Sequence, residues 1–125
     1  MFTPQNFQSM EEANKFVDEK SAELSSKMST KVTPFFFVEC EEPLDIAYGF
    51  FRNPSRTLKI QALDMASQQG PLTAGELLLK GCLIKEESDP RIGSDDPNYD
   101  AINIGAIGAS YKVISVHSDQ KKTIK

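Results

Sequence analysis

The stretch between residues 50 and 87 constrains the fold most, because it contains two helix starts separated by a proline-marked break. Ser55 is a suitable N-cap for the first of these helices, and Gln69-Gly70-Pro71 ends it. Apolar residues recur at helical spacing between these two points. We expect the apolar face of this helix to consist of Leu58, Ala62, Met65 and Ala66, widened by Leu63.

The second helix begins at Pro71, which suits a first helical turn, and Thr73 with Glu76 offers a capping box. It carries the most apolar run of the chain, made of Leu72, Leu77, Leu78, Leu79, Cys82 and Leu83. We therefore expect this helix to lie at the centre of the core. Glycine inside a helix costs about 1 kcal/mol relative to alanine, so Gly75 predicts close packing of one helix on another.

Residues 32–40 and 46–51 have the composition of two strands, and the short turn between them predicts an antiparallel hairpin. Pro34 has no N–H to donate, which places it at the start of its strand or on an edge. Gly49 predicts a bulge or a close backbone approach. Three consecutive phenylalanines, residues 35–37, must point to both faces of a sheet. Either helices of this chain cover both faces, or a partner covers one.

Two further elements flank this region. Ser9 and Glu12 form a capping box for a helix that extends to about Met28. Pro97 favours the start of a last helix, although residues 110–116 could instead form a short strand. Residues 118–125 carry little apolar surface, which predicts a mobile tail. The expected fold class is α+β: residues 1–117 form a single small domain, an antiparallel β-hairpin with about four helices.

The residue inventory excludes several classes of function. A net charge of −4 argues against sequence-independent nucleic-acid binding. No run approaches the roughly 20 apolar residues of a membrane span, and the N-terminus lacks the pattern of a secretory signal. His117 is the only histidine, and we expect Cys40 and Cys82 to be buried, reduced thiols. We expect no catalytic residues, no metal site and no cofactor. Helix capping and solvation account for the acidic residues Asp89, Asp95, Asp96 and Asp100.

The remaining function class is binding to protein, either another protein or a second copy of this chain. The apolar stripe of the first helix is narrow, so this helix lies over the edge of a small core or docks on another chain. The candidate interaction surface combines that stripe with the two-faced strand and consists of Phe16, Val17, Leu24, Met28, Phe35 and Phe37.

Three consecutive motifs carry a family resemblance. They are Phe50-Phe51-Arg52-Asn53-Pro54, the polar break from Ser67 to Leu72, and the helix Ala74-Gly75-Glu76-Leu77-Leu78-Leu79-Lys80-Gly81-Cys82. From Tyr48 to Ile92 the chain resembles small tail-assembly-chaperone-like proteins of bacteriophages and prophages. The resemblance implies a non-enzymatic protein that binds the tape-measure or tail-tube protein in the cytoplasm of a bacterial host. The alternative is a structural component of the virion, either a head–tail connector or a minor virion protein.

Overall fold

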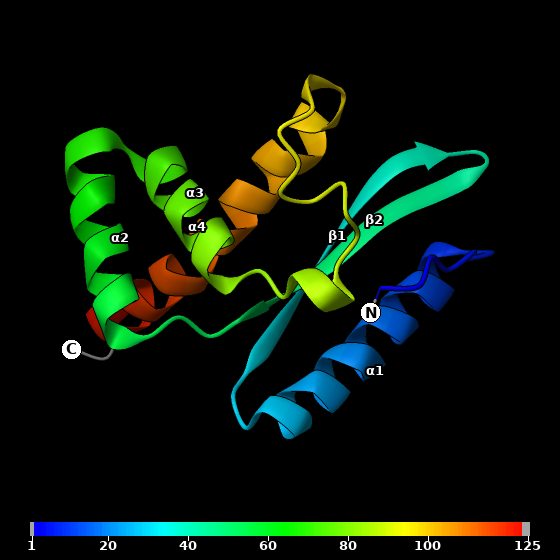
Figure 1. The fold of residues 1–125 in the computed structure, drawn as a ribbon. Helices are drawn as coiled ribbons and strands as arrows, with labels where there is room; N and C mark the ends of the chain where they lie inside the picture. Colours follow the sequence, from blue (N-terminus) through cyan, green and yellow to red (C-terminus); the bar gives the residue numbers. More distant parts are fainter. Residues whose placement is uncertain (1, 124–125) are drawn as a thin grey trace.

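The elements follow one another in the order expected from the sequence. The computed structural model describes the backbone of residues 2–123 and the side chains of residues 2–114. The elements are α1 (Met10–Met28), β1 (Val32–Glu41), β2 (Leu44–Arg52), α2 (Arg56–Gln69), α3 (Pro71–Cys82), 3-10 turns at Lys85–Glu87 and Pro97–Tyr99, and α4 (Asp100–Thr123). β1 and β2 form an antiparallel hairpin (Figure 1). The predicted α+β domain with one hairpin and four helices is confirmed for the described part of the chain.

Polar side chains begin α1 and α2 as predicted. The Ser9 Oγ accepts from the Glu12 N–H at 3.2 Å, and the Ser55 Oγ accepts from the Leu58 N–H at 3.2 Å. The capping box expected at Thr73 is wrong, because α3 begins at Pro71 and Thr73 already lies inside its first turn. Proline at the first position removes one unpaired N–H, so this helix starts without a side-chain cap.

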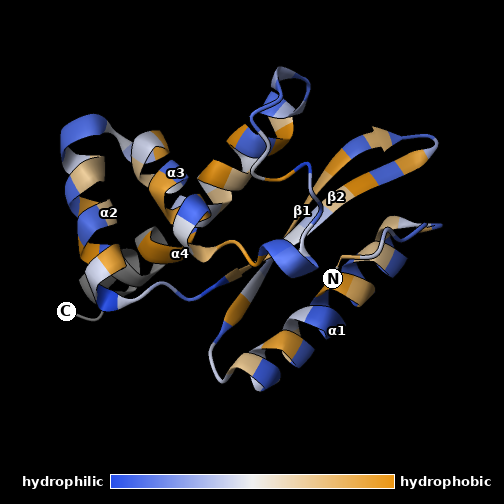
Figure 2. Cartoon of the chain, in the orientation of Figure 1, coloured by the Kyte–Doolittle hydropathy of each residue, from blue (hydrophilic) through white to orange (hydrophobic). Residues whose placement is uncertain are grey.

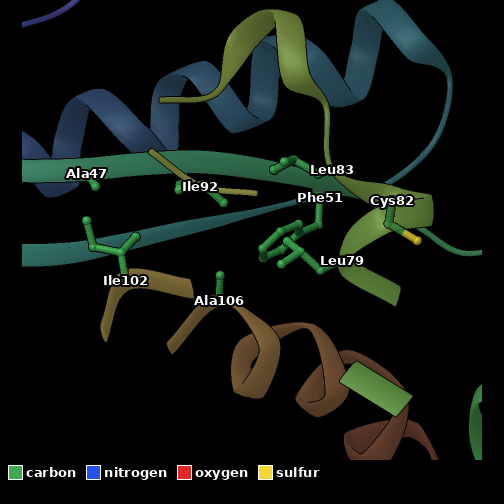
Figure 3. Close-up of a cluster of buried hydrophobic side chains, with 8 residues drawn as sticks. All are labelled: Ala47, Phe51, Leu79, Cys82, Leu83, Ile92, Ile102 and Ala106. Atoms are coloured by element: carbon green, nitrogen blue, oxygen red, sulfur yellow. The ribbon is translucent and has the colours of Figure 1, made fainter. Parts of the chain in front are cut away.

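The hairpin lies between two helical layers, with alternate side chains directed to each (Figure 1). On one face, Ile46, Tyr48 and Phe50 pack with the buried side of α1. On the other face, β2 contributes to a cluster with α3, α4 and the loop between them (Figure 3). That cluster consists of Ala47, Phe51, Leu79, Cys82, Leu83, Ile92, Ile102 and Ala106.

A third apolar cluster joins the three C-terminal helices. Leu78 on α3 packs with Ala62 of α2 and with Ile114 of α4, and Leu78 is only 1% exposed. The central position predicted for α3 is therefore confirmed. Leu63 and Leu72, which the sequence assigns to the apolar runs of their helices, are exposed. Hydrophobic and hydrophilic residues alternate along the ribbons of α1, α2 and α3 (Figure 2).

Two glycines mark close approaches of the backbone. A side chain at Gly75 would meet the backbone carbonyl of Ile107 on α4, which confirms the predicted helix packing. A Cβ at Gly49 would lie 2.8 Å from the Ile92 side chain and 3.0 Å from the Ser88 hydroxyl. Gly49 is thus a site of close approach, and the irregularity in the hairpin falls elsewhere, between Val38 and Cys40.

The last element is helical throughout its described length. α4 extends from Asp100 to Thr123, so residues 110–116 form part of a helix and no strand. Residues 118–123, assigned to the tail by the sequence, have helical backbone, and residues 124 and 125 lie outside the described residues. The mobility of the tail stays a prediction. No helix in the described part of the chain is both long enough and apolar enough to cross a lipid bilayer.

Candidate interaction surface

The apolar stripe of α1 is largely enclosed by the rest of the domain. Val17 and Leu24 are 1% and 3% exposed, because the facing side of the hairpin covers them. The ring of Phe16 packs on those of Phe7 and Tyr48, with centroids 5.5 Å apart in each pair. The expectation that this stripe stays open to a partner is therefore wrong for Val17 and Leu24, which belong to the core.

Of the other candidate residues, two are partly buried and one is exposed. Phe35 and Phe37 are partly buried against α4, and a Cβ at Gly105 would lie 3.3 Å from the Phe37 ring. Met28, at the end of α1, is exposed. Helices of this chain therefore cover both faces of the hairpin, which decides between the two alternatives that the phenylalanine run leaves open. A partner that pairs with the backbone of the hairpin must therefore do so at an edge of the sheet.

The outer edge of β2 is closed by the segment that follows α3. The Ile84 N–H donates to the Phe50 carbonyl at 2.9 Å, and the Asp89 N–H donates to the Tyr48 carbonyl at 2.9 Å. Between them, the Ser88 hydroxyl accepts from the Phe50 N–H at 3.0 Å and donates to the Ile84 carbonyl at 2.7 Å. The hydroxyl thus satisfies the buried Phe50 N–H and adds a second hydrogen bond to the Ile84 carbonyl, which also accepts from the Glu87 N–H. This edge of β2 cannot pair with another strand.

Two polar side chains fix the closing segment in place. The Arg91 guanidinium contacts the Asp45 carboxylate at 2.9 and 3.1 Å and the Asp89 carboxylate at 2.8 and 3.1 Å. The two N–H groups of the Asn103 amide are shared among the carbonyls of Arg91, Ser94 and Tyr99, which lie 3.0, 3.3 and 2.9 Å from its nitrogen. The Asn103 amide oxygen accepts from the Gly93 N–H. Asp89 is buried and ion-paired, so the expectation that it is solvated is wrong.

The outer edge of β1 is closed only at its start. The Val32 N–H donates to the Ser25 Oγ at 2.9 Å, and the Val32 carbonyl accepts from the Ser21 Oγ at 2.7 Å. Pro34 comes next, opposite Phe50. Because Phe50 directs its N–H and carbonyl toward residues 84–88, its partner Pro34 directs its own backbone the opposite way, out of the sheet.

The same alternation directs the backbone groups of Phe36 and Val38 outward. Among the described residues, no protein group forms a hydrogen bond with these outward N–H and carbonyl groups. Pro34 sits where its missing N–H would point out of the sheet, which confirms the predicted edge position. We call the outward groups of residues 34–38 the open edge. It is the one backbone edge of the described hairpin that is available for pairing.

A cleft of about 520 Å³ lies between α3, the loop at residues 93–95 and α4. Its lining carries charges of both signs, and Lys80 pairs with Glu76 at 3.3 Å. The Asn103 amide in its wall is already hydrogen-bonded to the loop. The Ser94 hydroxyl in its lining accepts from the Asp96 N–H at 3.1 Å.

Burial makes Tyr48 and Cys82 hold their protons more strongly. Burial, together with the nearby charges of Asp89 and Glu87, raises the pKa of Tyr48 to about 12. At neutral pH its hydroxyl is therefore a donor, and it contacts the Thr3 carbonyl at 3.2 Å. Burial also raises the pKa of the Cys82 thiol, which disfavours the reactive thiolate. Both groups act in packing, and neither is activated as a nucleophile.

Neither cysteine forms a disulfide. Cys82 is buried as expected, but Cys40 is exposed near the tip of the hairpin, so the expectation of burial is wrong for Cys40. Asp96 caps the turn before α4, where its carboxylate accepts from the Asn98 N–H at 3.0 Å. Within the described residues, no three histidine, cysteine, aspartate or glutamate side chains come together to hold a metal ion. The side chain of His117 lies outside the described residues.

No family model, curated protein or solved structure matches this chain.

Replacing Ser88 with alanine should lower the free energy of unfolding by roughly 1–3 kcal/mol, because the buried Phe50 N–H loses its acceptor. The Ile84 carbonyl loses one of its two donors and keeps the Glu87 N–H at 3.2 Å. Urea denaturation followed by circular dichroism measures this change. Ser26→Ala is the matched control, since Ser26 is exposed on α1 and its loss should change stability by less than about 0.5 kcal/mol. Equal stability of the two variants would show that Ser88 does not hold the β2 edge closed.

The purified protein should contain no stoichiometric zinc or calcium, because the sequence has one histidine and no ordered ligand spacing. Treatment with a chelator should leave the melting temperature unchanged. Elemental analysis of the purified protein checks this expectation. About one metal ion per chain would contradict it.

Proposed function

We propose that this chain is a non-enzymatic protein of bacteriophage or prophage tail assembly, which binds the tape-measure or tail-tube protein in the cytoplasm of a bacterial host. The resemblance between Tyr48 and Ile92 suggests the tail-assembly role. In the fold, that stretch comprises most of β2, all of α2 and α3, and the segment that closes the β2 edge. The resemblance therefore covers one continuous part of the structure, which supports treating it as a unit.

The single observation that carries the binding role is the open edge of β1. An extended peptide can add to such an edge as a further strand, and main-chain hydrogen bonds then supply the affinity. Serines of α1 close the start of this edge, and the segment after α3 closes the opposite edge. Phe36 and Val38 therefore offer their backbone groups at one defined place.

A pull-down with edge variants tests this proposal. The tagged chain is produced together with a tape-measure or tail-tube protein of the same phage or prophage. Val38→Pro removes an outward N–H, whereas Val38→Ala also loses packing but keeps the N–H. Proline is compatible with this side of the strand, because Pro34 already occupies an outward position. We expect the wild type and Val38→Ala to capture the tail protein and Val38→Pro to lose it.

Two results would count against the proposal. Equal capture by Val38→Pro, with folding verified by circular dichroism, would move the binding site away from the open edge. Failure of the wild type to capture either tail protein would contradict the tail-assembly role. Mass spectrometry of purified particles separates the alternative function: a protein that acts only during assembly should be absent, whereas a structural virion component should be present.

A further inference from the structure

We infer that, in the absence of another partner, the open edge of β1 pairs with the same edge of a second copy of this chain. This inference shares the open edge with the proposed function and names a specific occupant for it. The geometry of the two sheet edges indicates that a second copy of the chain can bind there. Each chain has one closed edge and one open edge, so pairing between two open edges leaves neither copy with a free edge.

The outward groups of residues 34–38 are complementary to themselves in the antiparallel direction. With the two-fold axis at Phe36, each Phe36 N–H donates to the Phe36 carbonyl of the other copy. Each Val38 N–H then donates to the Pro34 carbonyl of the other copy. In this register the Pro34 carbonyl accepts a hydrogen bond, and the missing N–H of Pro34 costs only the bond to the Val38 carbonyl. The Val38 carbonyl lies where the strand becomes irregular, and there it can remain hydrated.

The charges at the two ends of the open edge favour the same register. Lys31 precedes β1, and Glu41 ends it, at equal sequence distances from Phe36. Antiparallel pairing about Phe36 therefore brings the end of the edge that carries Lys31 in one copy toward the end that carries Glu41 in the other, twice by symmetry. The two side chains lie beyond the paired residues 34–38, because α1 closes the edge at Val32 and the strand is irregular after Val38. Their attraction acts across solvent at the ends of the contact. A shift of the axis by four residues, to Cys40, would place Glu39 of one copy opposite Glu41 of the other, which like-charge repulsion opposes.

The predicted assembly is a closed dimer. Since residues 84–89 occupy the other edge of the sheet, the four-stranded sheet cannot extend to a third copy. The contact involves a short stretch of one strand, which places it among small interfaces that associate weakly. We therefore expect monomer and dimer in a concentration-dependent equilibrium and no large oligomers.

Sedimentation velocity from low micromolar to near-millimolar concentration tests the inference on the full chain. The wild type and Val38→Ala should shift from monomer toward dimer as concentration rises. Val38→Pro should raise the dissociation constant about tenfold or more, since it removes one hydrogen bond in each direction. At low salt, Lys31→Glu and Glu41→Lys should each weaken the dimer by roughly threefold, and the double variant with both changes should restore it.

Each result decides the inference. A wild type that stays monomeric at every concentration overturns it, and so does a dimer that Val38→Pro leaves unchanged. Single charge reversals without effect overturn the register centred on Phe36. Failure here is distinguishable from failure of the proposed function, because a monomer that captures a tail protein through the open edge supports the function and contradicts the dimer. A dimer that captures no tail protein supports the pairing of two copies and contradicts the proposed function.

Discussion

Replacing Leu78 with alanine should lower the free energy of unfolding by roughly 2–5 kcal/mol. Leu78 is almost fully buried where α2, α3 and α4 meet, in contact with Ala62, Ala74 and Ile114. Two of these neighbours are alanines, whose short side chains cannot move to fill the space. The cavity should therefore persist, and its cost adds to the lost transfer free energy of the leucine side chain.

Urea denaturation of Leu78→Ala beside Leu72→Ala measures this effect. Leu72 lies on the same helix but is 60% exposed, so its truncation should change stability by less than about 0.5 kcal/mol. The same substitution on one helix thus gives two very different shifts of the urea midpoint. A small shift for Leu78→Ala, or similar shifts for both variants, would place α3 at the periphery of the domain.

Replacing Gly75 with alanine should destabilise the protein by roughly 1–3 kcal/mol, although alanine is the better helix former. The added methyl group would meet the backbone carbonyl of Ile107, and it would also lie 2.8 Å from the Ile107 side chain. A rotamer change can move the side chain but not the carbonyl. The crossing of α3 and α4 must therefore open, which loosens packing on both sides of it.

Gly108→Ala is the matched control for Gly75→Ala. Gly108 lies on α4, but nothing is within 4 Å of the position of an added Cβ. Alanine there should stabilise the protein by about 0.4–1 kcal/mol, because it reduces the freedom of the unfolded chain. Opposite changes in melting temperature for the two variants are the expected result. Stabilisation by both would contradict the close crossing at Gly75.

Local signals in the sequence are sufficient to predict the elements and their order. The N-caps at Ser9 and Ser55, the break at Gly70-Pro71 and the two-strand composition each act over a few residues, and the structure confirms all of them. The capping box at Thr73 is wrong because the sequence offers two overlapping helix starts, Pro71 and Thr73, and the local pattern does not distinguish them. Proline at the first helical position determined the start.

Contacts between distant segments could not be predicted in the same way. The Ser88 hydroxyl closes the β2 edge, and Arg91 bridges to Asp45, yet each lies in a polar loop without periodicity. The loop composition resembles that of a solvated connection, so Asp89 was assigned to solvent. The burial of the α1 stripe is equally hard to predict, because it depends on hairpin side chains that are distant in the sequence.

The hairpin register decides which residues of β1 direct their N–H and carbonyl groups away from β2. The sequence alone does not define that register. Pro34 was the one local signal, because a residue without an N–H belongs at an edge. It identified the side of β1 that faces outward but not the absence of a covering segment. That absence follows only from the hydrogen bonds of the described residues, where β2 is covered and β1 is covered at Val32 alone.

Amide hydrogen exchange of Phe36 and Val38, measured by NMR at low and high protein concentration, tests the central claim most directly. The Phe50 amide is the internal reference, because Ser88 holds it at every concentration. We predict that Phe36 and Val38 exchange rapidly in dilute solution and become protected on concentration, while Phe50 stays protected throughout. Protection of Phe36 and Val38 even in dilute solution, or exchange that concentration leaves unchanged, would contradict an open edge that pairs with a second copy.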